Sequence, residues 1–258
     1  MEAMIYGHKT ALSLSISNKP SYLRPMKWGI VTFPGSNCDQ DMADAVRLLP
    51  NAQSVRLWHK DTDTQSVDVL VLPGGFSYGD YLRSGAIARF SPIMQAVERH
   101  AASGRPLIGI CNGFQVLVEA GLLPGALLHN TQRRFICRDV HVRVEQTDSI
   151  LTRNTKVGHV LRLPIAHGEG RYFAPQDELK RLEDNGQVIL RYCSPEGELA
   201  EEWNPNGSTN HIAGICNPAG NICGLMPHPE RVMHPNMGNT DGRSLLESVA
   251  SSLGLISV

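Results

Sequence analysis

Residues 107–115 read LIGICNGFQ, in which an apolar run meets Gly-x-Cys-x-Gly and continues with helical spacing. A short, continuous apolar run of this kind is typical of a strand buried on both faces of a parallel sheet. A sharp strand-to-helix turn between glycines presents the residue at its apex to the edge of the sheet. We therefore expect a strand at 106–110, a helix at 113–120, and Cys111 at the turn between them.

Short β-branched runs and helical stretches alternate on the N-terminal side of this segment. Strands are expected at 30–33, 55–58 and 67–72, and helices at 38–49 and 91–102. Alternation of this kind predicts an α/β fold with a doubly wound, flavodoxin-like, mostly parallel sheet.

The sequence changes character after residue 130. Extended segments at 135–144, 160–166, 187–192, 212–217 and 222–226 are separated by turn residues. These segments predict hairpin-like antiparallel strands added to one edge of the sheet, followed by a helix at 242–253. We find no linker and no internal repeat, so residues 26–258 are expected to form one domain. The Ser-rich residues 1–25 show no periodicity and are expected to be a disordered N-terminal extension.

Composition excludes several classes of function. The 258 residues include 24 Lys and Arg against 25 Asp and Glu, a formal net charge of −1. Nucleic-acid binding through phosphate neutralisation requires a basic excess, which is absent. No apolar run approaches the roughly 18 residues of a membrane span. The six cysteines include no C-x-x-C pair, so we expect no metal site and a cytoplasmic protein with reduced thiols.

Cys111 is the candidate nucleophile. The helix that follows it directs the positive end of its dipole at the sulfur and favours the thiolate. The backbone N–H of Asn112, in the first helical turn, is available to stabilise an oxyanion. The alternative interpretation is an ordinary buried cysteine, which most cysteines are.

A second segment, GLMPHPER at 224–231, supplies a candidate base and its orienting carboxylate. His228 and Glu230 are two residues apart, so in an extended chain they point to the same side. A surface histidine near a Pro-rich turn is the alternative.

The third segment is LVLPGGFSYGD at 70–80, in which a buried strand ends at Gly74 and Gly75. The backbone N–H groups of these glycines could complete an oxyanion hole; the alternative is a simple tight turn. Together the three segments predict acyl transfer through a thioester on Cys111.

Longer strings make the chain similar to a known family. They are FPGSNCD (33–39), PGGFSYGDYLR (73–83), GICNGFQ (109–115), PIAHGEGRY (164–172) and PHPER (227–231). With the order Cys…His-x-Glu, they resemble class I (triad-type) glutamine amidotransferases, and within these the glutaminase subunits of phosphoribosylformylglycinamidine synthases. The resemblance extends from residue 27 to the last helix.

The resemblance implies an activity and partners. The chain would hydrolyse L-glutamine and pass ammonia to a large synthetase subunit. That subunit would use ATP and Mg²⁺ to convert formylglycinamide ribonucleotide to its amidine in purine biosynthesis. A small bridging subunit would join the two, and this chain itself would carry no cofactor. Gln115, His167 and Arg171 occupy positions near the glutamine pocket of the family.

Two other functions remain open at this stage. One is a stand-alone Cys-His-Glu γ-glutamyl hydrolase, which needs no sealed path for ammonia. The other is a catalytically silent regulatory homologue, although such proteins usually lack the nucleophile or the base. The five cysteines other than Cys111 are interpreted as small apolar fillers, at positions 38, 137, 193, 216 and 223.

Overall fold

The computed structural model describes residues 24–253 of the chain. Its strands are β1 (Met26–Thr32), β2 (Ala52–Trp58), β3 (Val69–Leu72), β4 (Leu107–Ile110), β5 (Ala126–Leu128), β6 (Ile136–Val144), β7 (Val160–His167), β8 (Arg171–Phe173), β9 (Val188–Cys193), β10 (Ile212–Cys216) and β11 (Ile222–Leu225). Its α-helices are α1 (Asp39–Arg47), α2 (Ile93–Ala102), α3 (Asn112–Glu119), α4 (Gln176–Asp184) and α5 (Asp241–Ser252). Short 3₁₀ turns connect several of these elements.

Nine strands form one sheet in the order β2-β1-β3-β4-β11-β10-β9-β6-β7, and β5 pairs with β8 in a second, small sheet. The strands from β2 to β11 in this order run parallel to their neighbours. From β10 to β7, adjacent strands are antiparallel. The expected doubly wound, mostly parallel α/β sheet with antiparallel edge strands is confirmed.

One strand assignment was wrong. β11 was expected among the antiparallel edge strands, but it lies in the middle of the sheet and pairs in parallel with β4. All four of its residues are buried, as a central strand requires. The hairpin from β10 reverses the chain, so β11 regains the direction of the parallel half while β10 does not. This placement brings the segment that follows β11 to the carboxyl end of β4, beside Cys111.

Three elements were not anticipated: α4, β5 and β8. Helix α4, QDELKRLED, buries only Leu179 and Leu182, so its apolar periodicity is weak against seven polar residues. β5 and β8 have three residues each, too short for a period-2 pattern to be recognised.

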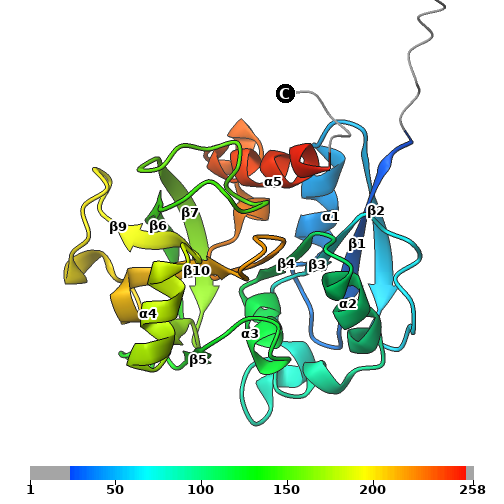
Figure 1. Ribbon diagram of the computed structural model, residues 1–258, viewed down its shortest axis with the longest axis horizontal. Helices are drawn as coiled ribbons and strands as arrows, with labels where there is room; N and C mark the ends of the chain where they lie inside the picture. Colours follow the sequence, from blue (N-terminus) through cyan, green and yellow to red (C-terminus); the bar gives the residue numbers. More distant parts are fainter. Residues whose placement is uncertain (1–23, 254–258) are drawn as a thin grey trace, which may run out of the picture.

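Helices cover the parallel half of the sheet on both faces. Figure 1 shows α1 and α5 together above the strands, and α2 and α3 below them. The central strands β3 and β4 are buried at every residue. Burial on two faces explains why these strands read as continuous apolar runs rather than as alternating ones. A single apolar cluster of the described residues runs from Met26 to Ala250.

The predicted disordered extension, residues 1–25, lies mainly in residues 1–23, which are outside the described part of the chain. Of residues 1–25, only Arg24 and Pro25 are described, and the Arg24 guanidinium pairs with Asp68 at 2.6 Å. Within residues 24–253, no helix has the length and apolar character needed to cross a bilayer.

A buried histidine makes stability dependent on pH. His100 on α2 is fully buried, with Nε2 2.9 Å from the Pro106 carbonyl oxygen. Burial lowers its pKa from 6.5 to about 4, despite the opposing effect of that hydrogen bond. The unfolded chain therefore binds a proton between pH 6.5 and 4 that the folded protein does not bind. As the pH is lowered from 6.5 to 4, we therefore expect His100 to reduce the free energy of unfolding by about 3 kcal/mol.

Urea unfolding at a series of pH values measures this effect. His100→Gln keeps a donor for Pro106 without the titration, so its stability should change less with pH between 6.5 and 4. An equal slope for the variant and the parent protein would contradict the prediction.

Candidate active site

Cys111 occupies a strained turn between β4 and α3. Its backbone has φ 50° and ψ −106°, a conformation that L-residues rarely adopt. The Cys111 N–H donates to the Leu225 carbonyl at 2.8 Å, which fixes the turn to β11. Strain of this kind persists only where the surroundings enforce it, and it concentrates at functional residues. The expected position of Cys111, at the apex of the strand–helix turn, is confirmed.

The glycines beside Cys111 serve close packing. A Cβ on Gly113 would lie 1.8 Å from the Leu72 carbonyl oxygen, and one on Gly109 would lie 2.6 Å from the Gly113 oxygen. Neither position allows any side chain. The positive φ of the turn is carried by Cys111 itself, so these glycines bring α3 against β3 and β4 and thereby set where the thiol stands.

His228 and Glu230 form a buried pair at the end of the segment after β11. Imidazole Nδ1 lies 2.6 Å from Glu230 Oε1, and both side chains are 1% exposed. The expected pairing is confirmed, but its geometric basis was wrong. Residues Pro229–Arg231 form a 3₁₀ turn with His228 at its N-cap, rather than an extended strand. The His228 N–H donates to the Pro164 carbonyl at 2.8 Å, which ties this turn to β7.

The electrostatic environment of His228 favours the imidazolium. Burial lowers the pKa of His228, but the Glu230 carboxylate and the Cys111 and Cys38 sulfurs raise it by more, so it stands well above 6.5. His228 Nε2 and Glu230 Oε2 are buried without a hydrogen-bond partner in the described chain. A positively charged imidazole beside a sulfur is the arrangement that activates a thiol as a nucleophile.

A cavity of about 190 Å³ opens beside Cys111. It is lined by Gly75, Phe76, Asp80, Ser84, Cys111, Gln115, His129, Arg133, Arg134, Phe135, Ala166, His167, Gly168 and Glu169. Cys111 Sγ is 3.7 Å from the Ala166 carbonyl oxygen and is the nucleophilic group of this lining. A small cavity of mixed polar lining around a nucleophile is the usual form of a binding site for a small substrate.

Charges of both signs face this cavity. Asp80 and Glu169 supply carboxylates, while Arg133 and Arg134 supply cations. Burial, together with Glu169 and against a hydrogen bond to Ser84, raises the pKa of Asp80 to about 6. The cavity is therefore matched to a ligand that carries an ammonium group and a carboxylate.

Asn112 and Gln115 were candidate site residues, and the structure gives their side chains supporting contacts. The Asn112 side-chain oxygen accepts from the Ser77 N–H at 3.1 Å, and its Nδ2 donates to Gln115 Oε1 at 3.0 Å. Gln115 Nε2 donates to the Glu169 carbonyl. Gln115 lines the cavity, whereas Asn112 holds the loop after β3 against α3.

Gly74 and Gly75 lie on either side of the site. Gly75, with φ +147°, lines the cavity, as expected for a residue with an exposed backbone. Gly74 instead faces the imidazole: a Cβ there would lie 2.6 Å from His228 Cε1 and 3.0 Å from Cys38 Sγ. Because neither glycine has a side chain, Gly75 leaves room for the substrate cavity and Gly74 leaves room for the His228 imidazole.

His167 and Arg171 have different surroundings. His167 lines the cavity, and its Nδ1 lies 3.1 Å from Asn130 Oδ1. Burial, and secondarily His228, lowers the pKa of His167 to about 4, so its ring is neutral at pH 7. Arg171 does not line this cavity; it borders a neighbouring hollow with Asn130 and His129. The reason is that Arg171 belongs to β8, beyond the turn that ends at Gly170.

Sequence reasoning missed Cys38 and Arg231. Cys38 was interpreted as a filler, but its sulfur lies beside His228 and accepts from the Arg231 guanidinium at 2.9 Å. Its position within FPGSNCD, one of the strings typical of the family, was the available signal. Asp80 and Glu169 were also missed, although both lie in quoted strings.

The remaining four cysteines differ in their burial. Cys193, Cys216 and Cys223 are buried, and burial raises the pKa of each thiol, to about 11 for the first two. They are the expected apolar fillers. Cys137 is exposed, so its interpretation as a filler was wrong. It lies on β6, whose residues alternate only partly between buried and exposed.

Comparison with known proteins agrees with this geometry. Residues 26–249 match the model of the CobB/CobQ-like glutamine amidotransferase domain. A phosphoribosylformylglycinamidine synthase subunit PurQ from Acaryochloris marina is 54% identical over 88% of this chain and 97% of its own length. The PurQ subunit from Gloeobacter violaceus is also 54% identical, over 90% of this chain and all of its own.

Solved structures show the same relationship. A chain from the structure of PurLQS from Thermotoga maritima superposes with a TM-score of 0.79 and 39% identity, covering 89% of this chain and 99% of that one. A glutamine amidotransferase from the same organism has a TM-score of 0.53 at 17% identity, covers 89% of this chain and 93% of its own, and shows the shared fold. The chain therefore belongs to the class I glutamine amidotransferases, and within them to the family of PurQ subunits of phosphoribosylformylglycinamidine synthase.

Proposed function

We propose that the chain is the glutaminase subunit of a phosphoribosylformylglycinamidine synthase. It hydrolyses L-glutamine through a thioester on Cys111 and delivers the ammonia for amidine formation from formylglycinamide ribonucleotide. The observation that carries this proposal is the buried His228–Glu230 pair beside a strained Cys111, in a chain 54% identical to such subunits.

The steps follow from the positions of the side chains. The Cys111 sulfur attacks the side-chain carbonyl carbon of glutamine, and His228 holds the proton that the thiol gives up. His228 passes that proton to the departing ammonia, and a thioester remains on Cys111. Water then attacks the thioester with His228 as the base, which releases glutamate. Glu230 orients the imidazole and stabilises its positive charge throughout.

Two backbone groups are suited to the oxyanion. The N–H of Asn112 belongs to the first turn of α3, where the helix dipole adds to its effect. Gly75 also brings backbone to the lining of the cavity that contains Cys111. The carboxylates of Asp80 and Glu169 are suited to the substrate ammonium, and the guanidinium groups of Arg133 and Arg134 to its carboxylate.

The partners are proposed from the resemblance and from one surface feature. The large synthetase subunit and a small bridging subunit would assemble with this chain, and ATP and Mg²⁺ would act in the synthetase. Large apolar side chains stand exposed near the cavity: Tyr81 is 74% and Leu82 is 90% exposed, and the rings of Phe76 and Phe135 lie 6.2 Å apart. Exposed apolar groups of this kind favour a docking surface. The assembly would work in the cytoplasm, in keeping with six free thiols.

Amidine formation by this chain together with its synthetase partner tests the proposal. Product that depends on glutamine and on this chain is the expected result. Product from ammonium alone, with glutamine giving none, would instead favour a stand-alone γ-glutamyl hydrolase or a silent homologue. An electrophile that mimics glutamine should modify Cys111 and spare the other five cysteines.

The Glu230→Gln variant should hydrolyse glutamine more slowly while still binding it. The amide cannot stabilise the imidazolium, so we expect kcat for glutamine hydrolysis to fall roughly 10²- to 10³-fold, with KM nearly unchanged. Steady-state kinetics of the assembled complex measures both constants. Glu247→Gln, which alters a partly buried carboxylate paired with Arg243 on α5, is the matched control and should behave as the parent protein. A loss confined to KM would show that Glu230 serves binding rather than the base.

A further inference from the structure

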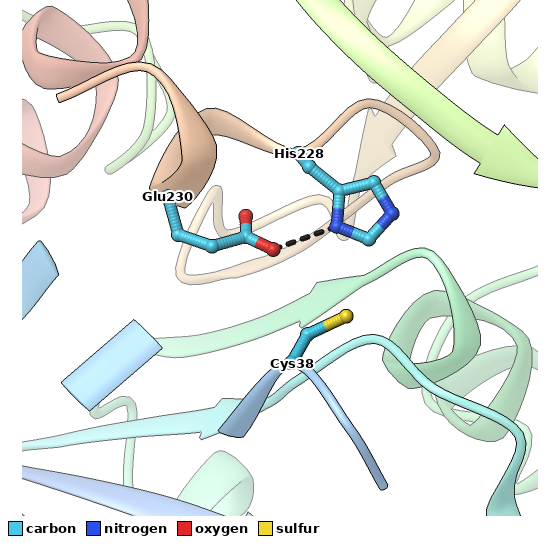
Figure 2. A group of neighbouring side chains, drawn as sticks. All are labelled: Cys38, His228 and Glu230. Atoms are coloured by element: carbon cyan, nitrogen blue, oxygen red, sulfur yellow. Dashed lines mark hydrogen bonds and ion pairs between the residues drawn. The ribbon is translucent and has the colours of Figure 1, made fainter. Parts of the chain in front are cut away.

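A third side chain shares the buried space of the His228–Glu230 pair. Cys38, at the N-cap of α1, comes from the opposite end of the chain and turns its sulfur toward the imidazole, as Figure 2 shows. One ligand-type atom from each of Cys38, His228 and Glu230 lies within 4.8 Å of the others. The Cys38 N–H donates to the Gly74 carbonyl at 3.3 Å, which fixes the loop that carries this thiol.

We propose that Cys38, His228 and Glu230 form a binding site for a soft divalent cation, with Zn²⁺ as the best match, and that occupation of this site switches off glutamine hydrolysis. The inhibitory consequence rests on the proposed function, whereas the binding site itself does not. A thiolate, an imidazole and a carboxylate are the three side-chain ligands that Zn²⁺ takes in proteins.

The dimensions of the cluster suit such an ion. Bonds of about 2.0–2.3 Å to a tetrahedral Zn²⁺ place its ligand atoms roughly 3.3–3.8 Å apart, so atoms as far as 4.8 Å from one another would approach by about 1–1.5 Å. The hydrogen bond of 2.6 Å between His228 Nδ1 and Glu230 Oε1 would open to admit the ion. All three side chains are buried, at 3%, 1% and 1% exposure respectively. A Cβ on Gly74 would lie 2.6 Å from His228 Cε1 and 3.0 Å from Cys38 Sγ, so the absence of a side chain at this position lets the imidazole and the thiol approach each other.

Two buried polar atoms of the cluster lack a hydrogen-bond partner. Both His228 Nε2 and Glu230 Oε2 are buried without a hydrogen-bond partner in the described chain. Burying such atoms unpartnered is costly, and an ion beside the Nδ1–Oε1 contact could take up Glu230 Oε2, whereas His228 Nε2 lies on the far side of the ring. An ion held by Nδ1 and Glu230 would replace the proton between them and leave the other ring proton on Nε2. Nε2 could then not accept the proton of Cys111, so hydrolysis would stop until the ion left.

Arg231 is the competitor for this site. Its guanidinium donates to Cys38 Sγ at 2.9 Å and also lies 3.4 Å from the Asp41 carboxylate. A fixed positive charge on the thiol opposes a second cation, so the metal must displace Arg231 from the sulfur. The site is therefore expected to bind Zn²⁺ reversibly rather than to retain it.

Binding is tested first, without reference to activity, in the full-length Cys111→Ala variant titrated with Co²⁺. Thiolate-to-cobalt absorption with one ion per chain is the expected result. Adding Cys38→Ala should abolish this absorption, whereas adding Cys137→Ala, which removes the exposed thiol, should leave it unchanged. Absence of the band in Cys111→Ala, or its persistence without Cys38, would overturn the proposal.

Inhibition is tested second, in the assembled complex with intact Cys111. Relative to its own uninhibited rate, Cys38→Ala should need at least about 10-fold more Zn²⁺ for half inhibition. Equal sensitivity would mean that the ion binds the Cys111–His228 pair alone, and the proposed inhibition through Cys38 would be rejected. Cobalt binding at Cys38 in a chain that hydrolyses no glutamine would refute the proposed function and leave the binding site standing.

Discussion

Replacing Cys111 with alanine is expected to abolish glutamine-dependent amidine formation, while ammonium-dependent formation by the same complex is retained. The thioester cannot form without the sulfur, so kcat/KM for glutamine should fall by at least about 10⁴-fold. Ammonium should bypass the defect because the ATP-dependent chemistry belongs to the synthetase partner. The small alanine side chain also fits a site that is already buried, at 4% exposure.

Both nitrogen donors must be assayed on the same preparation of the complex. Cys137→Ala is the matched control, because it removes a thiol that lies on the surface of β6 and should leave both activities intact. If Cys111→Ala also lost ammonium-dependent activity, the substitution would have damaged assembly, and the role of the thiol would need to be reassigned.

The Gly113→Ala variant is expected to lose more stability than any other single change considered. Its Cβ would lie 1.8 Å from the Leu72 carbonyl oxygen and 2.5 Å from the carbonyl carbon. Both atoms belong to backbone at the end of β3, so α3 must move away from the sheet. We expect the free energy of unfolding to fall by more than about 4 kcal/mol, as for severe overpacking of a core.

Urea unfolding of Gly113→Ala measures this loss, and Gly104→Ala provides the control. Gly104 has φ +78°, and a Cβ at this position would meet nothing within 4 Å, so its substitution costs only backbone strain, about 1 kcal/mol. Equal losses for the two variants would show that β3 and α3 separate easily and that the close contact does not hold the elbow. Soluble Gly113→Ala protein should also show a Cys111 that reacts slowly with electrophiles.

Local patterns in the chain were sufficient for the fold class and the chemistry. The nearly all-apolar runs at 67–72 and 106–110 predicted buried parallel strands, because burial on two faces favours apolar residues throughout, and the strands lie within these runs. The Gly-x-Cys-x-Gly turn after a buried strand made Cys111 the candidate nucleophile, because a sharp strand–helix turn presents the residue at its apex to the edge of the sheet. His228 and Glu230 were identified as a pair because they are neighbours in the sequence, even though their turn was assigned the wrong shape.

Long-range placement depended on tertiary structure. The parallel position of β11 beside β4 follows from competition among all the strands for the centre of the sheet, which no local window contains. The same packing brings Cys38 to His228, across about 190 residues of chain, and places Asp80 and Arg134 in the lining of one cavity. Side chains with weak local signals acquire their roles only when the folded backbone brings them together, because contacts of this kind are determined by the whole core rather than by neighbouring residues.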